Sequence, residues 1–137
     1  MTRTVLIVED TDLCRETLEV ALMGVPGLSL RSVETAEEAL ALLAQEPVCA
    51  LITDLHLQSR REAAMDGFEL IATVRSLPHA AALPILVISG DSAPHTAARV
   101  EELGANAFFA KPYSPAAVRN KLEQLIHASQ FAIHHPI

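Results

Sequence analysis

Short apolar runs alternate with longer stretches of helical periodicity along most of this chain. Residues 5–8 form a continuous apolar run, which is typical of a strand covered on both faces of a sheet. Residues 28–33 instead alternate between apolar and polar side chains, as an edge strand does. Together with similar runs further along, the pattern predicts strands at residues 5–8, 28–33, 48–53, 85–88 and 107–110.

Apolar residues recur at helical spacing between these strands. The expected helices cover residues 12–23, 35–45, 67–77, 92–103 and 114–129. In the first helix, the side chains expected to face inward are Leu13, Thr17, Val20 and Ala21. The fourth helix has a lighter inward face, made of Ala97, Val100 and Leu103. We therefore expect the fourth helix to be held less tightly than its neighbours.

Capping residues indicate where several of these helices begin and end. Thr35 and Glu38 have the spacing of a capping box. Ser92 and Pro94 stand where an N-cap and a first-turn proline belong. Gly104 has the position of a C-terminal stop.

The alternation of strands and helices predicts the α/β class. We expect a (βα)5 doubly wound parallel five-stranded sheet with helices on both faces. Residues 1–129 are expected to form one domain. Residues 130–137 have no visible cap or periodicity, and we expect a disordered C-terminal tail there.

Charge and composition exclude several classes of protein. The chain has 137 residues and a formal net charge of −7, which argues against direct nucleic-acid binding. No apolar stretch approaches the roughly 18 residues of a membrane span, so we expect no membrane insertion. The start of the chain lacks a signal-peptide pattern, and we expect a cytoplasmic protein whose Cys14 and Cys49 stay reduced.

Polar residues follow the predicted strands at the edge where a doubly wound sheet binds ligands. They are Glu9, Asp10, Asp54, Ser89 and Lys111. Three carboxylates at one place repel one another, so a counter-charge is needed, and Mg²⁺ suits oxygen ligands best. A carboxylate nucleophile, a metal ion, an ammonium and a hydroxyl are together the requirements of phosphoryl transfer.

Five segments in the expected order resemble the receiver domains of bacterial two-component response regulators. They read VLIVED (5–10), ALITDLHL (50–57), MDGFEL (65–70), LPILVISG (83–90) and GANAFFAKPYSP (104–115). The resemblance covers residues 4 to about 128 and implies the strand order 2-1-3-4-5.

The resemblance implies a role for each residue of the site. Asp54 corresponds to the phosphoacceptor. Glu9 and Asp10 correspond to the acidic pair that holds Mg²⁺ with Asp54, helped by the backbone carbonyl of His56. Lys111 corresponds to the lysine that contacts the phosphoryl group.

Further positions correspond to parts of the family's switch. Ser89 matches the switch hydroxyl, and Phe108 matches the aromatic whose rotamer follows that hydroxyl. The Lys111–Pro112 bond matches a peptide that is usually cis in the family. The chain departs from the pattern at residues 58–64, which resemble an insertion beside the acceptor.

The function implied is that of a signalling switch rather than an enzyme. Its partners would be a sensor histidine kinase or a histidine phosphotransfer protein, and an unknown downstream protein. The signalling surface is expected at residues 92–128, through which a homodimer could also form. The output, and whether the chain is free-standing or part of a longer protein, stay open.

Two other functions remain as alternatives. Asp10-Thr11-Asp12 is similar to the Asp-x-Asp of haloacid-dehalogenase-like phosphatases, and Gly90-Asp91 is similar to their last acidic motif. That interpretation leaves Asp54 without a role. A flavodoxin-like cofactor binder is the other alternative, but the acidic residues 9–12 would repel a phosphate.

Overall fold

Five parallel strands form the centre of the protein, as the apolar runs predict. The structure is a computed structural model that describes residues 3–57, 65–91 and 93–134. The strands are β1 (Arg3–Val8), β2 (Leu28–Val33), β3 (Ala50–Asp54), β4 (Ile85–Ser89) and β5 (Ala107–Ala110). The helices are α1 (Asp12–Leu22), α2 (Ala36–Gln45), α3 (Gly67–Ser76), α4 (Pro94–Leu103) and α5 (Pro115–His134).

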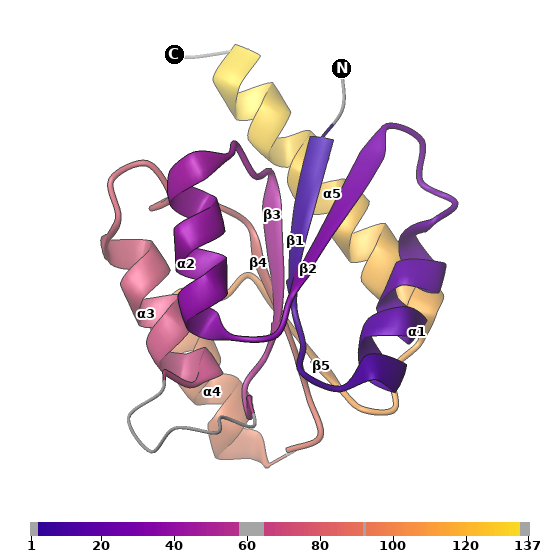
Figure 1. Cartoon of the computed structure of the whole chain (residues 1–137), viewed down its shortest axis with the longest axis vertical. Helices are drawn as coiled ribbons and strands as arrows, with labels where there is room; N and C mark the ends of the chain where they lie inside the picture. Colours follow the sequence, from indigo (N-terminus) through magenta and orange to yellow (C-terminus); the bar gives the residue numbers. More distant parts are fainter. Residues whose placement is uncertain (1–2, 58–64, 92, 135–137) are drawn as a thin grey trace.

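The strand order is β2-β1-β3-β4-β5, and every pair is parallel, which confirms the predicted fold class and topology. The register aligns the carboxyl ends of the central strands, since Asp54 pairs with Ile88 and Ser89 pairs with Ala110. This edge is at the bottom of Figure 1. Residues that follow β1, β3, β4 and β5 therefore reach the same edge.

Helices cover both faces of the sheet (Figure 1), with α1 and α5 on one side and α2, α3 and α4 on the other. Side chains along a strand point alternately to the two layers. In β1, Leu6 and Val8 pack toward α2, α3 and α4, whereas Val5 and Ile7 pack toward α1 and α5. Because both faces are covered, all of β3 and β4 is buried, and the site at their ends rests on rigid strands.

Several predicted helix boundaries are confirmed by their capping contacts. The Thr35 hydroxyl accepts a hydrogen bond from the Glu38 N–H at 3.1 Å. Gly104 ends α4 in the left-handed region, at φ 108°. The N-cap of α4 is Ala93, whose side chain makes no capping bond. Ser92, the predicted cap, and the predicted insertion at 58–64 lie outside the described residues.

The predicted inward face of the first helix is wrong in three of its four residues. Leu13, Thr17 and Val20 are exposed, and only Ala21 is buried. The helix instead buries Leu18, Ala21 and Leu22. Apolar residues occur both in the predicted set and in the buried set. The buried set continues at the same spacing to Val25, which is also buried.

The last helix, α5, and the question of a membrane span concern the molecule outside its sheet. The backbone of α5 is helical to His134, past residue 129, where the predicted domain ends. Within the described part of the chain, no helix is long and apolar enough to cross a membrane.

Candidate functional site

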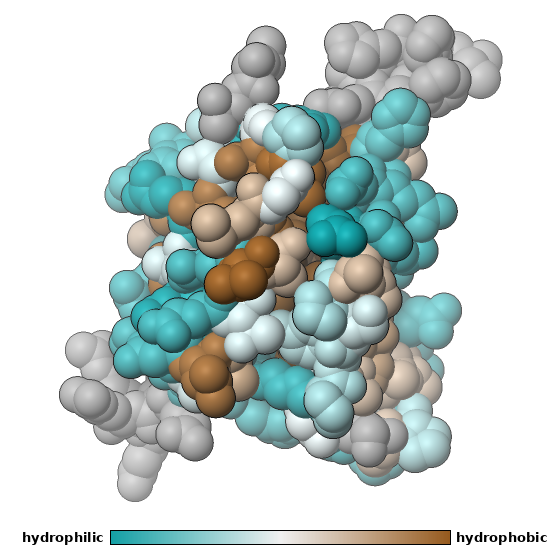
Figure 2. All heavy atoms as spheres, turned by 90° about the vertical axis from the view of Figure 1, so that its right-hand side faces the viewer, coloured by the Kyte–Doolittle hydropathy of each residue, from teal (hydrophilic) through white to brown (hydrophobic). Residues whose placement is uncertain are grey.

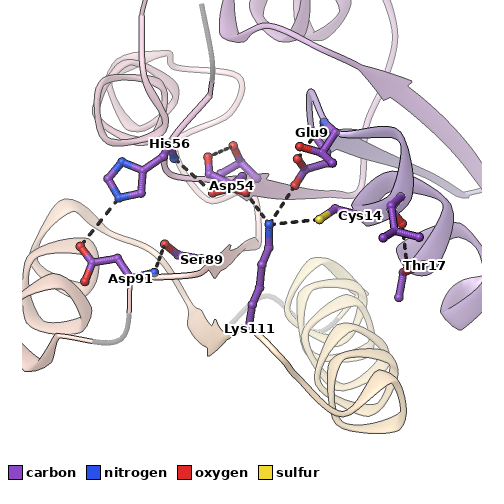
Figure 3. A network of polar contacts seen from close by, with 11 residues as sticks. Glu9, Cys14, Thr17, Asp54, His56, Ser89, Asp91 and Lys111 are labelled. Carbon is purple, nitrogen blue, oxygen red and sulfur yellow. Dashed lines mark hydrogen bonds and ion pairs between the residues drawn. The ribbon is translucent and has the colours of Figure 1, made fainter.

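Asp54 is the last residue of β3 and lies at the centre of the polar cluster (Figure 3). Its carboxylate is almost buried, with 8% of the residue exposed. Asp54 Oδ1 accepts a hydrogen bond from the His56 N–H at 3.1 Å, and Oδ2 accepts one from Lys111 Nζ at 2.7 Å. The acceptor predicted from the sequence is therefore fixed by a backbone donor and a cation.

Lys111 follows β5 and extends across the strand ends toward Asp54 (Figure 3). Its Nζ lies 3.5 Å from Glu9 Oε2 and 3.5 Å from Cys14 Sγ. Burial lowers the pKa of Lys111. The hydrogen bond to Asp54 and the charges of Asp54 and Glu9 raise it by more, so the pKa lies above its ordinary value. The predicted cis peptide at Lys111–Pro112 is present.

Glu9 brings a second carboxylate into this cluster with only 2% of its surface exposed. Its Oε1 accepts a hydrogen bond from the Thr11 N–H at 3.1 Å. Burial and then the nearby charge of Asp54 raise the pKa of Glu9 from 4.5 to about 7. The single ammonium of Lys111 thus faces two buried carboxylates, those of Glu9 and Asp54.

The excess of carboxylate fits a hard divalent cation. Asp10 is half-buried and directly follows Glu9, in the loop that leads from β1 to α1. Among the described residues, no group of three or more His, Cys, Asp or Glu side chains is arranged to hold a metal ion by itself. Mg²⁺ typically takes only one or two carboxylates and completes its shell with water and substrate oxygens, so it needs no such cage.

Ser89, the predicted switch hydroxyl, ends β4 and is fully buried. Its Oγ accepts a hydrogen bond from the Asp91 N–H at 3.0 Å, so the hydroxyl is engaged by the loop that leads to α4. Phe108 lies on β5 and packs, half-buried, against the same apolar layer as Val87 and Val100. The two predicted switch residues are thus on neighbouring strands.

Three features of the site were missed by the sequence analysis. Cys14 contacts Lys111 although 97 residues separate them, and nothing in the local pattern indicates this contact. Asp91 connects the loop after β4 to α4. Gly67 packs so closely on the acceptor loop that a Cβ there would lie 2.3 Å from the Asp54 carbonyl oxygen. Gly67 belongs to the MDGFEL segment, and this was the feature of the sequence that could have indicated its importance.

Comparison with known proteins decides between the interpretations. The family model of the response regulator receiver domain matches residues 5–123. The chain belongs to this receiver family. The Asp12 carboxylate, which the phosphatase alternative would need in the site, instead pairs with Arg15 at 2.9 Å on the surface of α1.

Individual relatives agree with this assignment. The transcriptional regulatory protein GltR of Pseudomonas aeruginosa is 30% identical to this receiver domain over 129 residues, which cover 94% of this chain and 51% of GltR. A solved structure described as a response regulator of Chloroflexus aurantiacus is 31% identical, with a TM-score of 0.83 and coverage of 93% and 99%. This receiver domain thus spans about half the length of GltR and nearly all of the Chloroflexus chain.

A more distant solved structure shares the fold. The receiver domain of the sensor histidine kinase PA1611 of Pseudomonas aeruginosa is 20% identical, with a TM-score of 0.79 and coverage of 93% and 99%. That structure has a magnesium ion coordinated in its active-site cleft. At this identity the likeness shows a shared fold.

Proposed function

We propose that Asp54 accepts a phosphoryl group from a phosphohistidine of a sensor histidine kinase or a histidine phosphotransfer protein. The observation that carries this proposal is the 2.7 Å hydrogen bond between Lys111 Nζ and Asp54 Oδ2 at the carboxyl end of β3. It places a cation where the incoming phosphoryl oxygens would develop charge.

In the transfer step, one Asp54 carboxylate oxygen forms a bond to phosphorus. The phosphorus–nitrogen bond of the donor breaks, and its electron pair stays on the imidazole nitrogen. Lys111 neutralises charge on the transferred oxygens, while the protein supplies mainly positioning. The product is an acyl phosphate on Asp54, and its formation makes this chain a signalling switch rather than a multiple-turnover enzyme.

Mg²⁺ is the cofactor that suits this site. Glu9, Asp10, Asp54 and the His56 backbone carbonyl would hold it, in keeping with the raised pKa of Glu9, about 7, and with the magnesium in the PA1611 receiver. When bound, the ion supplies charge neutralisation for the carboxylates and the phosphoryl oxygens. The same three carboxylates leave the metal-free site with repulsion that this cation removes.

We further propose that the phosphodonor docks on α1. The large apolar side chains that are exposed in the described part of the chain are Leu13, Val20 and Met23, at 72%, 69% and 76%. Figure 2 shows hydrophobic atoms at the surface of the face that contains α1 and α5. Leu13 and Val20 are seven residues apart, about two helical turns, so they share one side of α1.

The position of this α1 surface favours a helix of the donor as its occupant. A shallow groove beside Val20 is lined by α1 and by Pro115, the first residue of α5. Cys14, near the start of α1, contacts Lys111, so a helix that lies along α1 would end beside Asp54. A second copy of the chain would bring together two α1 helices, each with three carboxylates, Asp12, Glu16 and Glu19, and only one basic residue, Arg15. This like charge favours a partner with basic residues around its apolar face.

Residues 92–128 remain the proposed output surface. None of the large exposed apolar side chains of the described residues lies there. A homodimer through these residues would therefore have to be built on polar contacts and half-buried side chains such as Phe108.

Acetyl phosphate tests the chemistry without a protein donor. In the presence of Mg²⁺ the wild-type chain should gain one acid-labile phosphoryl group, and EDTA should prevent this. Asp54→Asn should gain none, whereas Asp12→Asn, which alters an exposed carboxylate of α1, should behave as wild type. Uptake that persists in Asp54→Asn would contradict the acceptor, and uptake that persists in EDTA would contradict the metal.

A further inference from the structure

Asp91 stands between the switch hydroxyl and the first turn of α4, and the site described above assigns it no role. Its backbone N–H donates to Ser89 Oγ at 3.0 Å. Its carboxylate accepts the Ala93 N–H on Oδ1 at 3.0 Å and the Thr96 hydroxyl on Oδ2 at 2.9 Å. One residue thus contacts the end of β4 through its backbone and the start of α4 through its side chain.

The carboxylate of Asp91 holds the N-terminal end of α4 through the Ala93 N–H and the Thr96 hydroxyl. Ala93, the N-cap, has no side-chain oxygen for the first turn, and its backbone carbonyl accepts the Thr96 N–H at 2.9 Å. Thr96 is 2% exposed, so its hydroxyl needs a partner inside the protein, and that partner is Asp91. The pKa of Asp91 is lowered, first by the Ala93 N–H and then by the Thr96 hydroxyl, which keeps the carboxylate ionised.

The other end of α4 is anchored independently of the site. Arg75 of α3 donates to the Gly104 carbonyl from Nε at 3.0 Å and from Nη2 at 2.7 Å. The same guanidinium donates to Asn106 Oδ1 at 3.0 Å, which ties α3 to the start of β5. The C-terminal end of α4 is therefore fixed to α3, while its N-terminal end depends on Asp91.

A fourth contact of Asp91 comes from the loop that follows Asp54. His56 Nε2 lies 3.7 Å from Asp91 Oδ2, across the mouth of the site (Figure 3). Asp91 is thus approached from the loop after Asp54, from Ser89 and from α4. These contacts make it the described side chain that joins the phosphorylation site to α4 most directly.

We propose that Asp91 is the positioning residue that couples the orientation of the Ser89 hydroxyl to the first turn of α4. The proposal rests on the function proposed above, in which Ser89 turns toward a phosphoryl group on Asp54. An Oγ that turns in this way leaves the Asp91 N–H, and the carboxylate loses the tether that holds it over Ala93 and Thr96. The start of α4 then loosens about its anchored end at Arg75.

A double-mutant cycle in the unphosphorylated protein tests this coupling by hydrogen exchange of the α4 amides. Asp91→Ala and Ser89→Ala should each speed exchange in the first turn of α4, about fivefold for the loss of a cap. Ser89→Ala removes the acceptor of the Asp91 N–H, and Asp91→Ala removes the carboxylate that holds Ala93 and Thr96. Because both interrupt one chain of contacts, the double variant should exchange no faster than Asp91→Ala alone. Equal effects of Ser89→Ala with and without Asp91 would overturn the proposal.

Two further variants separate positioning from a general loss of structure. Asp91→Asn keeps an acceptor for the Ala93 N–H and a partner for Thr96, so it should restore wild-type exchange in α4. Asp66→Ala removes the equivalent cap of α3, where the Asp66 carboxylate accepts the Glu69 N–H at 2.9 Å. It should speed exchange in α3 and leave α4 unchanged, and a change in α4 would overturn the assignment to Asp91.

The change in α4 hydrogen exchange on phosphorylation separates a coupling role of Asp91 from a purely structural one. Asp91→Ala should take up phosphoryl groups from acetyl phosphate as wild type does, but its α4 exchange should no longer respond. A response in Asp91→Ala as large as in wild type would overturn the proposal. Failure of the wild type to be phosphorylated would refute the proposed function instead, and the cycle in the unphosphorylated protein would still decide on Asp91.

Discussion

Glu9→Gln should make the metal-free protein more stable at neutral pH. The substitution keeps the shape of a side chain that is almost fully buried and removes its charge. Burial disfavours the charge of Glu9 most, repulsion from Asp54 adds to this, and Lys111 offsets only part of it. A neutral amide at this position removes the repulsion while it can still accept the Thr11 N–H.

The size of the effect follows from the pKa of Glu9. Its rise from 4.5 to about 7 in the folded protein corresponds to a penalty of about 3 kcal/mol at neutral pH. The folded state holds the extra proton, so this penalty is small below a pH of 4.5 and grows as the pH rises to about 7. At a pH of about 5 less than about 1 kcal/mol of it remains.

Urea unfolding in EDTA measures this difference directly. At a pH of about 7.5, Glu9→Gln should raise the free energy of unfolding by about 2–3 kcal/mol, and at a pH of about 5 the gain should fall below about 1 kcal/mol. Glu16→Gln is the matched control, since Glu16 is an exposed carboxylate of α1. It should change stability by less than about 0.5 kcal/mol at either pH.

Mg²⁺ should reverse the order of stability. A ligand that binds the folded state stabilises it in proportion to its affinity, and the wild type keeps the full set of carboxylates. Added Mg²⁺ should therefore stabilise the wild type more than Glu9→Gln. If Glu9→Gln is less stable than the wild type in EDTA at neutral pH, the account of excess negative charge at this site is wrong.

Three other variants test separate parts of the structure. Gly104→Ala should cost about 1–3 kcal/mol in urea unfolding, because the left-handed φ of 108° strains a side chain. Gly67→Ala should slow phosphoryl uptake from acetyl phosphate, because its Cβ would displace the backbone of Asp54. Leu13→Ser with Val20→Ser should slow transfer from a histidine kinase that phosphorylates the wild type, but not uptake from acetyl phosphate. Equal transfer to both proteins would exclude α1 as the docking surface.

Strand positions and the edge that carries the site could be predicted because both follow from local pattern. Continuous apolar runs specified buried parallel strands, and the strand ends then brought Glu9, Asp54 and Lys111 together. The capping box at Thr35 and the stop at Gly104 are equally local, since each depends on residues within one helical turn.

Features that depend on distant packing could not be predicted in this way. The chain offers two apolar series along α1, and only the contacts of Leu18 and Leu22 with the sheet and α5 decide which one is buried. The approach of Cys14 to Lys111 depends on the sheet as a whole. Asp91 was weighed only as part of a phosphatase motif, because a cap outside the usual N-cap position leaves no sequence signal.

Chemical trapping of the modified residue tests the central claim most directly. After incubation with Mg²⁺ and acetyl phosphate, borohydride reduces an aspartyl phosphate to homoserine, and peptide mapping then locates it. The account predicts one modified residue, Asp54, and none when EDTA is present. Stoichiometric homoserine at another aspartate, or a stable phosphoryl group on a side chain other than Asp54, would contradict it.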